Sequence, residues 1–182
     1  MRSQSHLNTS LRIIQTYDGI LPLSAWLKNF FSAEKKYGSK DRKQIAHYCY
    51  CYYRLGKAFE NKSKEEKLML GAFLSSTSPP ELLQDLRPDW NERIGDTLAD
   101  KINFLSAQEE MNQIFFLTEE LSKEIEKEKF QQSFLVQPDL FLRIRPGKEK
   151  LLKEKLTAAG IDFYQPGPDA LGMSNQTKLE AV

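Results

Sequence analysis

The sequence predicts a mainly α-helical domain followed by a small α+β unit. Before about residue 130, apolar residues recur at spacings of three and four, as the buried faces of amphipathic helices do. From Leu140 to Arg145 the pattern changes to the alternation of a β-strand. With 182 residues, the chain can hold one domain with a substantial core and part of another. We therefore expect a helical domain over 1–130 and the start of an α/β region over 131–182.

Glycine, proline and serine residues mark where the predicted helices begin and end. Pro22 suits a first helical turn, Gly38 is a favourable helix stop, and Ser39 and Ser63 are favourable N-caps. The four stronger helices are expected from Leu7 toward Gly19, from Pro22 toward Gly38, from Lys40 to about Phe59, and from Ser63 toward Ser78. Weaker patterns predict helices over 80–86, 90–98, 102–105 and 111–121, and a charged amphipathic helix over 118–130.

The last part of the sequence predicts a β-α-β-β unit. A strand over Leu140–Arg145 precedes a helix over Lys148–Ala159, which Gly160 ends. Two short strands, 161–164 and 170–173, are expected on either side of a turn at 166–169. Residues 177–182 resemble the opening of one more helix, so we expect this chain to be a fragment of a longer protein.

Charge is distributed unevenly, although the formal net charge is only +1. Eight basic and two acidic residues lie between Lys28 and Lys57, whereas thirteen acidic and five basic residues lie between Glu81 and Glu128. Such segregation indicates either a side that faces a polyanion or a set of solvated helix faces. No apolar run is long enough to span a membrane, and the N-terminus lacks the apolar core of a signal peptide. We expect a cytoplasmic protein.

No reaction centre can be assembled from these residues. His6 and His47 stand far apart without a motif, and the glycines form no loop that could hold a phosphate. Cys49 and Cys51 have no second pair with which to bind zinc, so we expect both to pack in the core. The sequence predicts no catalytic, cofactor-binding or metal-binding residue.

RNA binding has better candidates. Lys40, Arg42 and Lys43 fall in the first turn of a predicted helix, where cations oppose the helix dipole and so require another reason to be there. Lys40 and Lys43 favour contact with phosphate. Asp41 and Arg42 fit a structural role equally well, with Asp41 bonded to first-turn N–H groups and Arg42 paired with a carboxylate of a neighbouring helix. Tyr50 and Tyr53 are candidates to stack on bases.

Three segments resemble one protein family. The first segment is Gly38–Ala46, followed by Tyr50 and Tyr53–Gly56. The second is Leu21–Leu23, followed by Trp26, Leu27, Phe30 and Phe31. The third is Gln137–Lys148. The first two resemble the NusB-like domain at the start of bacterial Sun/Fmu (RsmB-type) ribosomal RNA cytosine-5 methyltransferases. The third is similar to the segment that opens the pre-methyltransferase region of that family. Residues 76–130 match in helical character alone.

The resemblance implies the RNA-targeting portion of such an enzyme. Its S-adenosylmethionine site and thiolate nucleophile would belong to a methyltransferase domain beyond residue 182, so no cofactor is expected in this fragment. The expected partners are ribosomal RNA and that missing domain. The expected RNA-binding residues are Lys40, Arg42, Lys43, Arg54, Arg143, Arg145 and Lys148. If six of them faced one groove, log affinity plotted against log salt concentration would have a slope of roughly −4.

Two alternatives are open at the level of sequence. One is a stand-alone NusB-type antitermination factor, against which the β-α-β-β unit argues. The other is a helical protein-interaction module without RNA contact, which would use the acidic region between Glu81 and Glu128.

Overall fold

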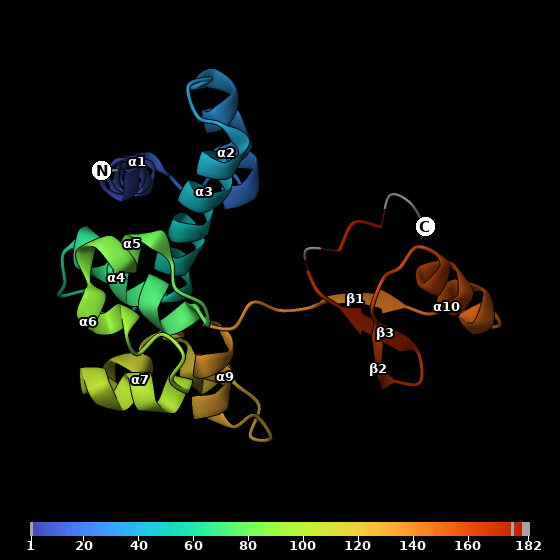
Figure 1. Ribbon diagram of the computed structural model, residues 1–182. Helices are drawn as coiled ribbons and strands as arrows, with labels where there is room; N and C mark the ends of the chain where they lie inside the picture. Colours follow the sequence, from blue (N-terminus) through green and yellow to red (C-terminus); the bar gives the residue numbers. More distant parts are fainter. Residues whose placement is uncertain (1, 176, 180–182) are drawn as a thin grey trace. The chain divides into compact units, whose positions relative to one another are not determined.

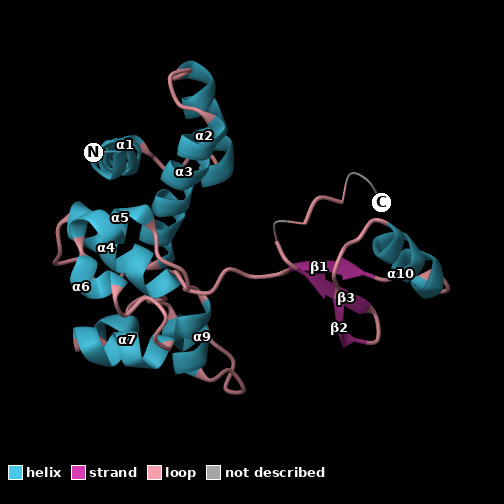
Figure 2. Ribbon diagram, viewed as in Figure 1, coloured by secondary structure: helices cyan, strands magenta, loops and turns pink. Residues whose placement is uncertain are grey.

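The computed structural model describes residues 2–175 and 177–179, and the chain divides after Val136 into two compact units. The first unit is helical, and the second is a three-stranded antiparallel sheet with one helix (Figures 1 and 2). The predicted fold class, mainly α followed by a small α+β unit, is confirmed. The division falls six residues beyond the expected boundary, because Gln131 and Leu135 are buried within the helical unit.

Helix α3 (Ser39–Arg54) is central to the helical unit, because α1 (Arg2–Thr16) and α4 (Lys64–Ser75) both pack against it. Helix α2 (Leu23–Ala33) precedes α3, and Leu27 and Phe31 of α2 share a core cluster with Ile13, Ile45 and Cys49. The remaining elements are α5 (Glu81–Leu86), α6 (Pro88–Asn91), α7 (Leu98–Leu105), α8 (Gln108–Met111), the 3-10 turn η1 (Thr118–Glu120) and α9 (Lys127–Ser133).

Several predicted helices are shorter in the structure. Helix α3 ends at Arg54, because Gly56 and Phe59 have φ angles of +49° and +57°, which a right-handed helix cannot contain. The helix predicted over 90–98 is wrong: α6 ends at Asn91, and α7 begins after Thr97, whose hydroxyl accepts the Asp100 N–H at 3.2 Å. The helix predicted over 111–121 is also wrong, since α8 ends at Met111.

The charged helix predicted over 118–130 is wrong as well. Residues 118–120 form a single 3-10 turn, and helix returns only with α9. Glu120, Glu124 and Glu128 lie four residues apart, so a continuous helix would have stacked three like charges on one face. The end of this segment is held instead by the buried Gln131, whose amide accepts the Phe115 N–H at 2.6 Å and donates to the Asn112 carbonyl at 2.7 Å.

The second unit contains β1 (Leu140–Arg143), α10 (Glu149–Ala158), β2 (Tyr164–Gly167) and β3 (Ala170–Met173), with strand order β1-β3-β2. Its core is formed by Ile144, Leu156, Leu171 and Met173. The strand predicted over 161–164 begins only at Tyr164, because the Ile161 N–H bonds the Leu156 carbonyl and thereby closes the end of α10. The predicted turn at 166–169 is correspondingly shorter, because β2 continues through Pro166, which an edge strand tolerates.

Within the described residues, none of the helices has both the length and the apolar character that crossing a bilayer requires.

Candidate nucleic-acid interface

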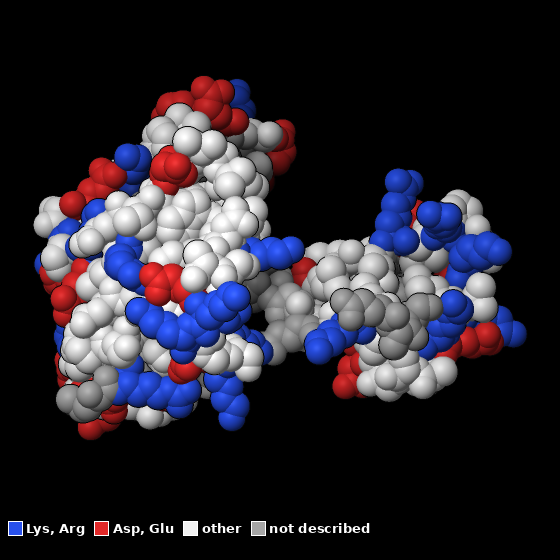
Figure 3. All heavy atoms as spheres, turned by 90° about the horizontal axis from the view of Figure 1, so that it is seen from above, with Lys and Arg blue, Asp and Glu red and all other residues white. Residues whose placement is uncertain are grey.

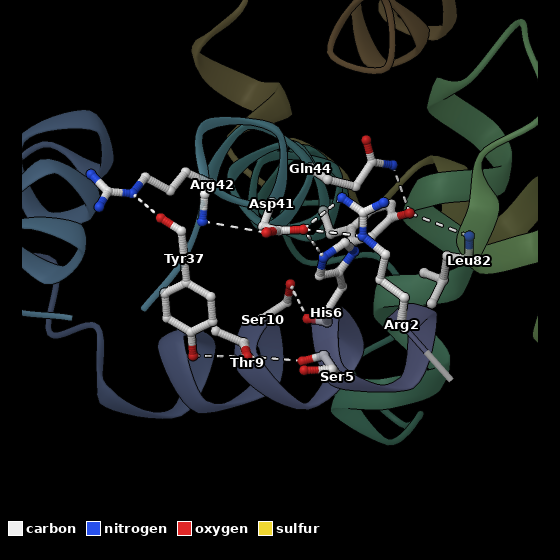
Figure 4. A network of polar contacts seen from close by, with 12 residues as sticks. Arg2, Ser5, His6, Thr9, Ser10, Tyr37, Asp41, Arg42, Gln44 and Leu82 are labelled. Carbon is white, nitrogen blue, oxygen red and sulfur yellow. Dashed lines mark hydrogen bonds and ion pairs between the residues drawn. The ribbon is translucent and has the colours of Figure 1, made fainter. Parts of the chain in front are cut away.

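The carboxylate of Asp41 joins the first turn of α3 to α1. Its Oδ1 accepts from Arg2 Nη2 at 2.8 Å and Nε at 3.1 Å, and from His6 Nε2 at 2.9 Å, while Oδ2 accepts the Gly38 N–H at 3.3 Å (Figure 4). The bonds from Arg2 and then His6 hold the pKa of Asp41 below its ordinary value. His6 is 4% exposed, so part of this contact is shielded from water. These contacts give Asp41 a structural role.

Arg42 points away from Asp41 and also stabilises the start of α3. Its Nε donates to the Tyr37 carbonyl at 2.7 Å (Figure 4). Its guanidinium lies 5.9 Å from the centre of the Phe31 ring. These contacts are structural, but they involve the Tyr37 carbonyl and the Phe31 ring in place of the expected carboxylate of a neighbouring helix. The guanidinium still carries a charge close to the surface, because the residue is only half-buried.

Lys40 and Lys43 lie close to cations and carboxylates of other elements. Both are exposed, and they line a depression of about 290 Å³ whose other lining residues are Arg2, His6, Gln44 and Glu81. Lys40 and Lys43 come from α3, Arg2 from α1, and Glu81 from α5. The structure thus brings two predicted RNA-binding residues together and adds Arg2, which the sequence did not indicate.

A second, more open depression of about 880 Å³ adjoins the first, because Arg2 and His6 line both. Arg12, Lys36 and Tyr37 also line it. Arg12 and Lys36 share the carboxylate of Glu34 at 2.9 and 3.3 Å, and the bond from Lys36 is the main reason that the pKa of Glu34 is lowered. We call these two depressions, with their five cations Arg2, Arg12, Lys36, Lys40 and Lys43, the α1–α3 surface.

Figure 3 shows basic side chains across the middle of the helical unit as it is seen from above, with acidic side chains among them and along its edges. On the α1–α3 surface, Asp41, Glu34 and Glu81 stand beside the five cations. Cations therefore exceed carboxylates locally, although several are already paired. Lys40 and Lys43 are the exposed lysines of the smaller depression.

Arg54 does not belong to the α1–α3 surface. It ends α3, fourteen residues after Lys40, which corresponds to roughly 21 Å along the helix. Its cationic side chain suits the negative end of the helix dipole, and together with burial it lowers the pKa of His47. Of the two tyrosines expected to stack on bases, Tyr53 packs edge-to-face on the rings of Tyr17 and Tyr52, so its ring takes part in the packing of the helical unit. The side chain of Tyr50 is 38% exposed.

Cys49 and Cys51 are fully buried free thiols, as expected for packing residues, and burial raises the pKa of each to about 12. Among the residues that the structure describes, no cluster of histidine, cysteine and carboxylate side chains could hold a metal ion.

In the second unit, the three predicted RNA-binding residues Arg143, Arg145 and Lys148 lie together. They line a depression of about 400 Å³ beside β1 and α10, with Lys155 as a fourth cation and an apolar wall of Leu142, Leu151 and Leu152. Lys155 was missed by the sequence reasoning, although its position one helical turn after Leu151 places it on the same side of α10. We call this site the β1–α10 pocket.

Comparisons with known proteins identify no relative: no family model, no curated protein and no solved structure matches this chain.

Replacing Asp41 with asparagine should lower the melting temperature at neutral pH and reduce the loss of stability on acidification. The pKa of Asp41 is lowered from its ordinary value of 3.8, so its stabilising effect is present above that pH and is lost as the pH falls through the folded-state pKa. Thermal melts of both proteins from about pH 7 to about pH 3 test this. Burial lowers the pKa of His47 from its ordinary value of 6.5, so acid also destabilises the folded protein at His47, but by the same amount in wild type and in the variant.

Asp89→Asn is the matched control, since the ion pair that it removes, with Arg87 at 3.2 Å, is local in sequence. It should lower the melting temperature less than Asp41→Asn. Parallel pH profiles for wild type and Asp41→Asn would contradict the structural role of Asp41.

Proposed function

We propose that this chain is the RNA-binding, targeting portion of an S-adenosylmethionine-dependent ribosomal RNA 5-methylcytosine methyltransferase. One observation carries the proposal: Lys40 and Lys43, singled out by the sequence, share a depression with Arg2 of another helix. Cations from separate segments that meet on one surface suit the phosphates of a folded RNA. The β1–α10 pocket supports the proposal independently, because it gathers four cations within thirteen residues, from Arg143 at the end of β1 to Lys155 in α10.

In this proposal the residues described here bind and orient RNA, and they carry out no chemistry. The methyl donor would be S-adenosylmethionine, held by the methyltransferase domain that the family resemblance implies. Ribosomal RNA and that domain are the proposed partners, and the cytoplasm is the proposed location.

Reversing the charge of Lys40 and Lys43 together should weaken the binding of every RNA sequence alike. Two lost phosphate contacts should make the dependence of log affinity on log salt shallower by roughly 1.4, and the affinity at low salt should fall by at least about tenfold. Filter binding of ribosomal RNA fragments to wild type and to Lys40→Glu/Lys43→Glu, at several salt concentrations, measures both effects.

Lys123→Glu/Lys127→Glu is the matched control. Both lysines are exposed, and the double variant changes the net charge equally, but these residues lie in the acidic region of the helical unit. It should leave the salt dependence nearly unchanged, since phosphate contacts act locally. Equal losses of affinity in the two double variants would contradict a specific α1–α3 surface.

A competing explanation is that Lys40 and Lys43 only neutralise carboxylates of this chain, and Glu81 in the same depression gives it support. In that case the charge reversal would lower the melting temperature and leave RNA affinity unchanged. Under the RNA proposal the melting temperature should hold or rise slightly, because acidic residues suit the first turn of a helix. A thermal melt of the same double variant therefore separates the two.

A protein-interaction module is the second candidate function. It is favoured by large apolar side chains of the helical unit that are open to water, since Phe116, Phe134 and Val136 are 60%, 38% and 61% exposed. Exposed apolar surface of this kind suits contact with a protein partner. Absence of RNA binding by the wild-type chain would favour this candidate.

A further inference from the structure

The face of the sheet opposite its core carries aromatic side chains. In β1, Leu140 and Leu142 point to the core, whereas Phe141 and Arg143 alternate with them and are exposed. Gly172 of β3 is directly opposite both Phe141 of β1 and Tyr164 of β2. Phe141, Gly172 and Tyr164 therefore form one row across the three strands, on the face away from α10.

Gly172 allows the ring of Tyr164 to lie on the sheet. A Cβ at position 172 would overlap ring atoms of Tyr164, so the ring rests directly on the glycine backbone. The Tyr164 hydroxyl donates to Asp139 Oδ2 at 2.8 Å, which anchors the far end of the ring beside the start of β1. The ring is thus supported from below and fixed at its tip, while the residue is still 48% exposed. Phe141 is 55% exposed.

Charge beside this face favours a nucleic acid over an apolar protein segment. Arg143 shares the face with Phe141, two residues further along β1. Arg143 also lines the β1–α10 pocket with Arg145 and Lys148. The carboxylate closest to the rings, that of Asp139, is already bonded to Tyr164. Flat exposed rings next to a row of cations are the two components of single-strand recognition, in which bases stack and phosphates pair with cations.

We propose that Tyr164 and Phe141 form a stacking platform for unpaired bases of single-stranded RNA, with the backbone of that RNA running along Arg143 toward the β1–α10 pocket. The proposal deepens and rests on the RNA-binding function proposed above. Every base has a flat face that can stack on an aromatic ring, so the platform accepts bases of different sequence.

The test uses the full chain and two decamers of RNA. One is a decauridylate with a single 2-aminopurine, and the other is an abasic decamer with the same phosphates. Stacking contributes roughly 1–3 kcal/mol per base, so wild type should bind the base-bearing decamer at least about fivefold more tightly than the abasic one. Phe141→Ala/Tyr164→Ala should abolish this difference, and the fluorescence of bound 2-aminopurine, quenched by wild type, should stay high.

Tyr164→Phe should preserve the preference, because it keeps the ring and loses only the bond to Asp139. Phe116→Ala removes an equally exposed ring from the helical unit and should change nothing. Phe141→Ala alone guards against misfolding, because Phe141 is an exposed side chain outside the core cluster.

Equal binding of the two decamers by wild type would overturn the platform and leave this face to a protein partner. The proposed function would survive that result if Lys40→Glu/Lys43→Glu still weakened both decamers equally. Absence of binding to either decamer would overturn the platform, whereas the proposed function would fail only if ribosomal RNA fragments also did not bind in the filter assay.

Discussion

Gly56→Ala should lower the free energy of unfolding of the helical unit by roughly 3 kcal/mol or more. Two costs add at this position: a left-handed backbone, which costs an alanine roughly 1–2 kcal/mol, and an overpacked contact, which costs roughly 1–3 kcal/mol. Gly56 has φ +49°, and a Cβ there would overlap the carbonyl of Ile114. That carbonyl cannot simply move away, because it accepts the Lys57 N–H at 3.4 Å.

Two other glycines separate these costs. Gly19 has φ +76° and nothing within 4 Å of an added Cβ, so Gly19→Ala reports backbone strain alone. Gly95 also has open space, and its φ lies outside the positive range, so Gly95→Ala should change stability by less than about 0.5 kcal/mol. Urea unfolding followed by circular dichroism gives all three values. A loss at Gly56 no larger than that at Gly19 would show that the backbone at Ile114 relaxes.

Periodicity predicted the fold class because α1 to α4 and β1 are each long enough to repeat their pattern. Leu7, Leu11 and Ile14 occupy one face of α1, and the alternation of β1 distinguishes its two faces. Residues 87–134 lacked such repeats, and their short helices are positioned by tertiary packing of Trp90, Ile102 and Met111 in one core cluster and by tertiary hydrogen bonds. The side chain of Gln131, for example, holds the backbone at Asn112 and Phe115, which no local pattern reveals.

The candidate sites were predictable only where one segment supplies the whole site. Arg143, Arg145 and Lys148 are close in sequence, and the structure brings them into one pocket. Arg2 and Arg12 were missed because their importance depends on Asp41 and Glu34, which lie 39 and 22 residues away in sequence. Phe141 carried a usable signal, since alternation places it with Arg143 on the face opposite Leu140 and Leu142.

Lys101→Met should lower the free energy of unfolding by about 2 kcal/mol, although it removes a charge that is costly to bury. Lys101 is 2% exposed, and its Nζ donates to the Ser76 carbonyl at 2.7 Å and to the Phe73 carbonyl at 3.3 Å. It thereby satisfies carbonyls at the C-terminal end of α4, where a cation also suits the helix dipole. Leaving a buried acceptor without a donor costs roughly 1–3 kcal/mol.

Lys101→Met also removes a buried charge, and this effect stabilises the folded protein and so opposes the loss of stability. Burial lowers the pKa of Lys101, which means that its charged form is less well solvated in the folded protein than in the unfolded one. The loss is the larger effect, because Lys101→Met leaves two carbonyls without a donor and also removes the contact between the ammonium and the Phe73 ring, whose centre lies 5.2 Å away.

Lys64→Met, at an exposed position in the first turn of α4, is the control and should change stability by less than about 0.5 kcal/mol. Urea unfolding of both variants measures the difference. A Lys101→Met protein as stable as wild type would mean that desolvation dominates, as it does where buried ion pairs are replaced by apolar residues without loss.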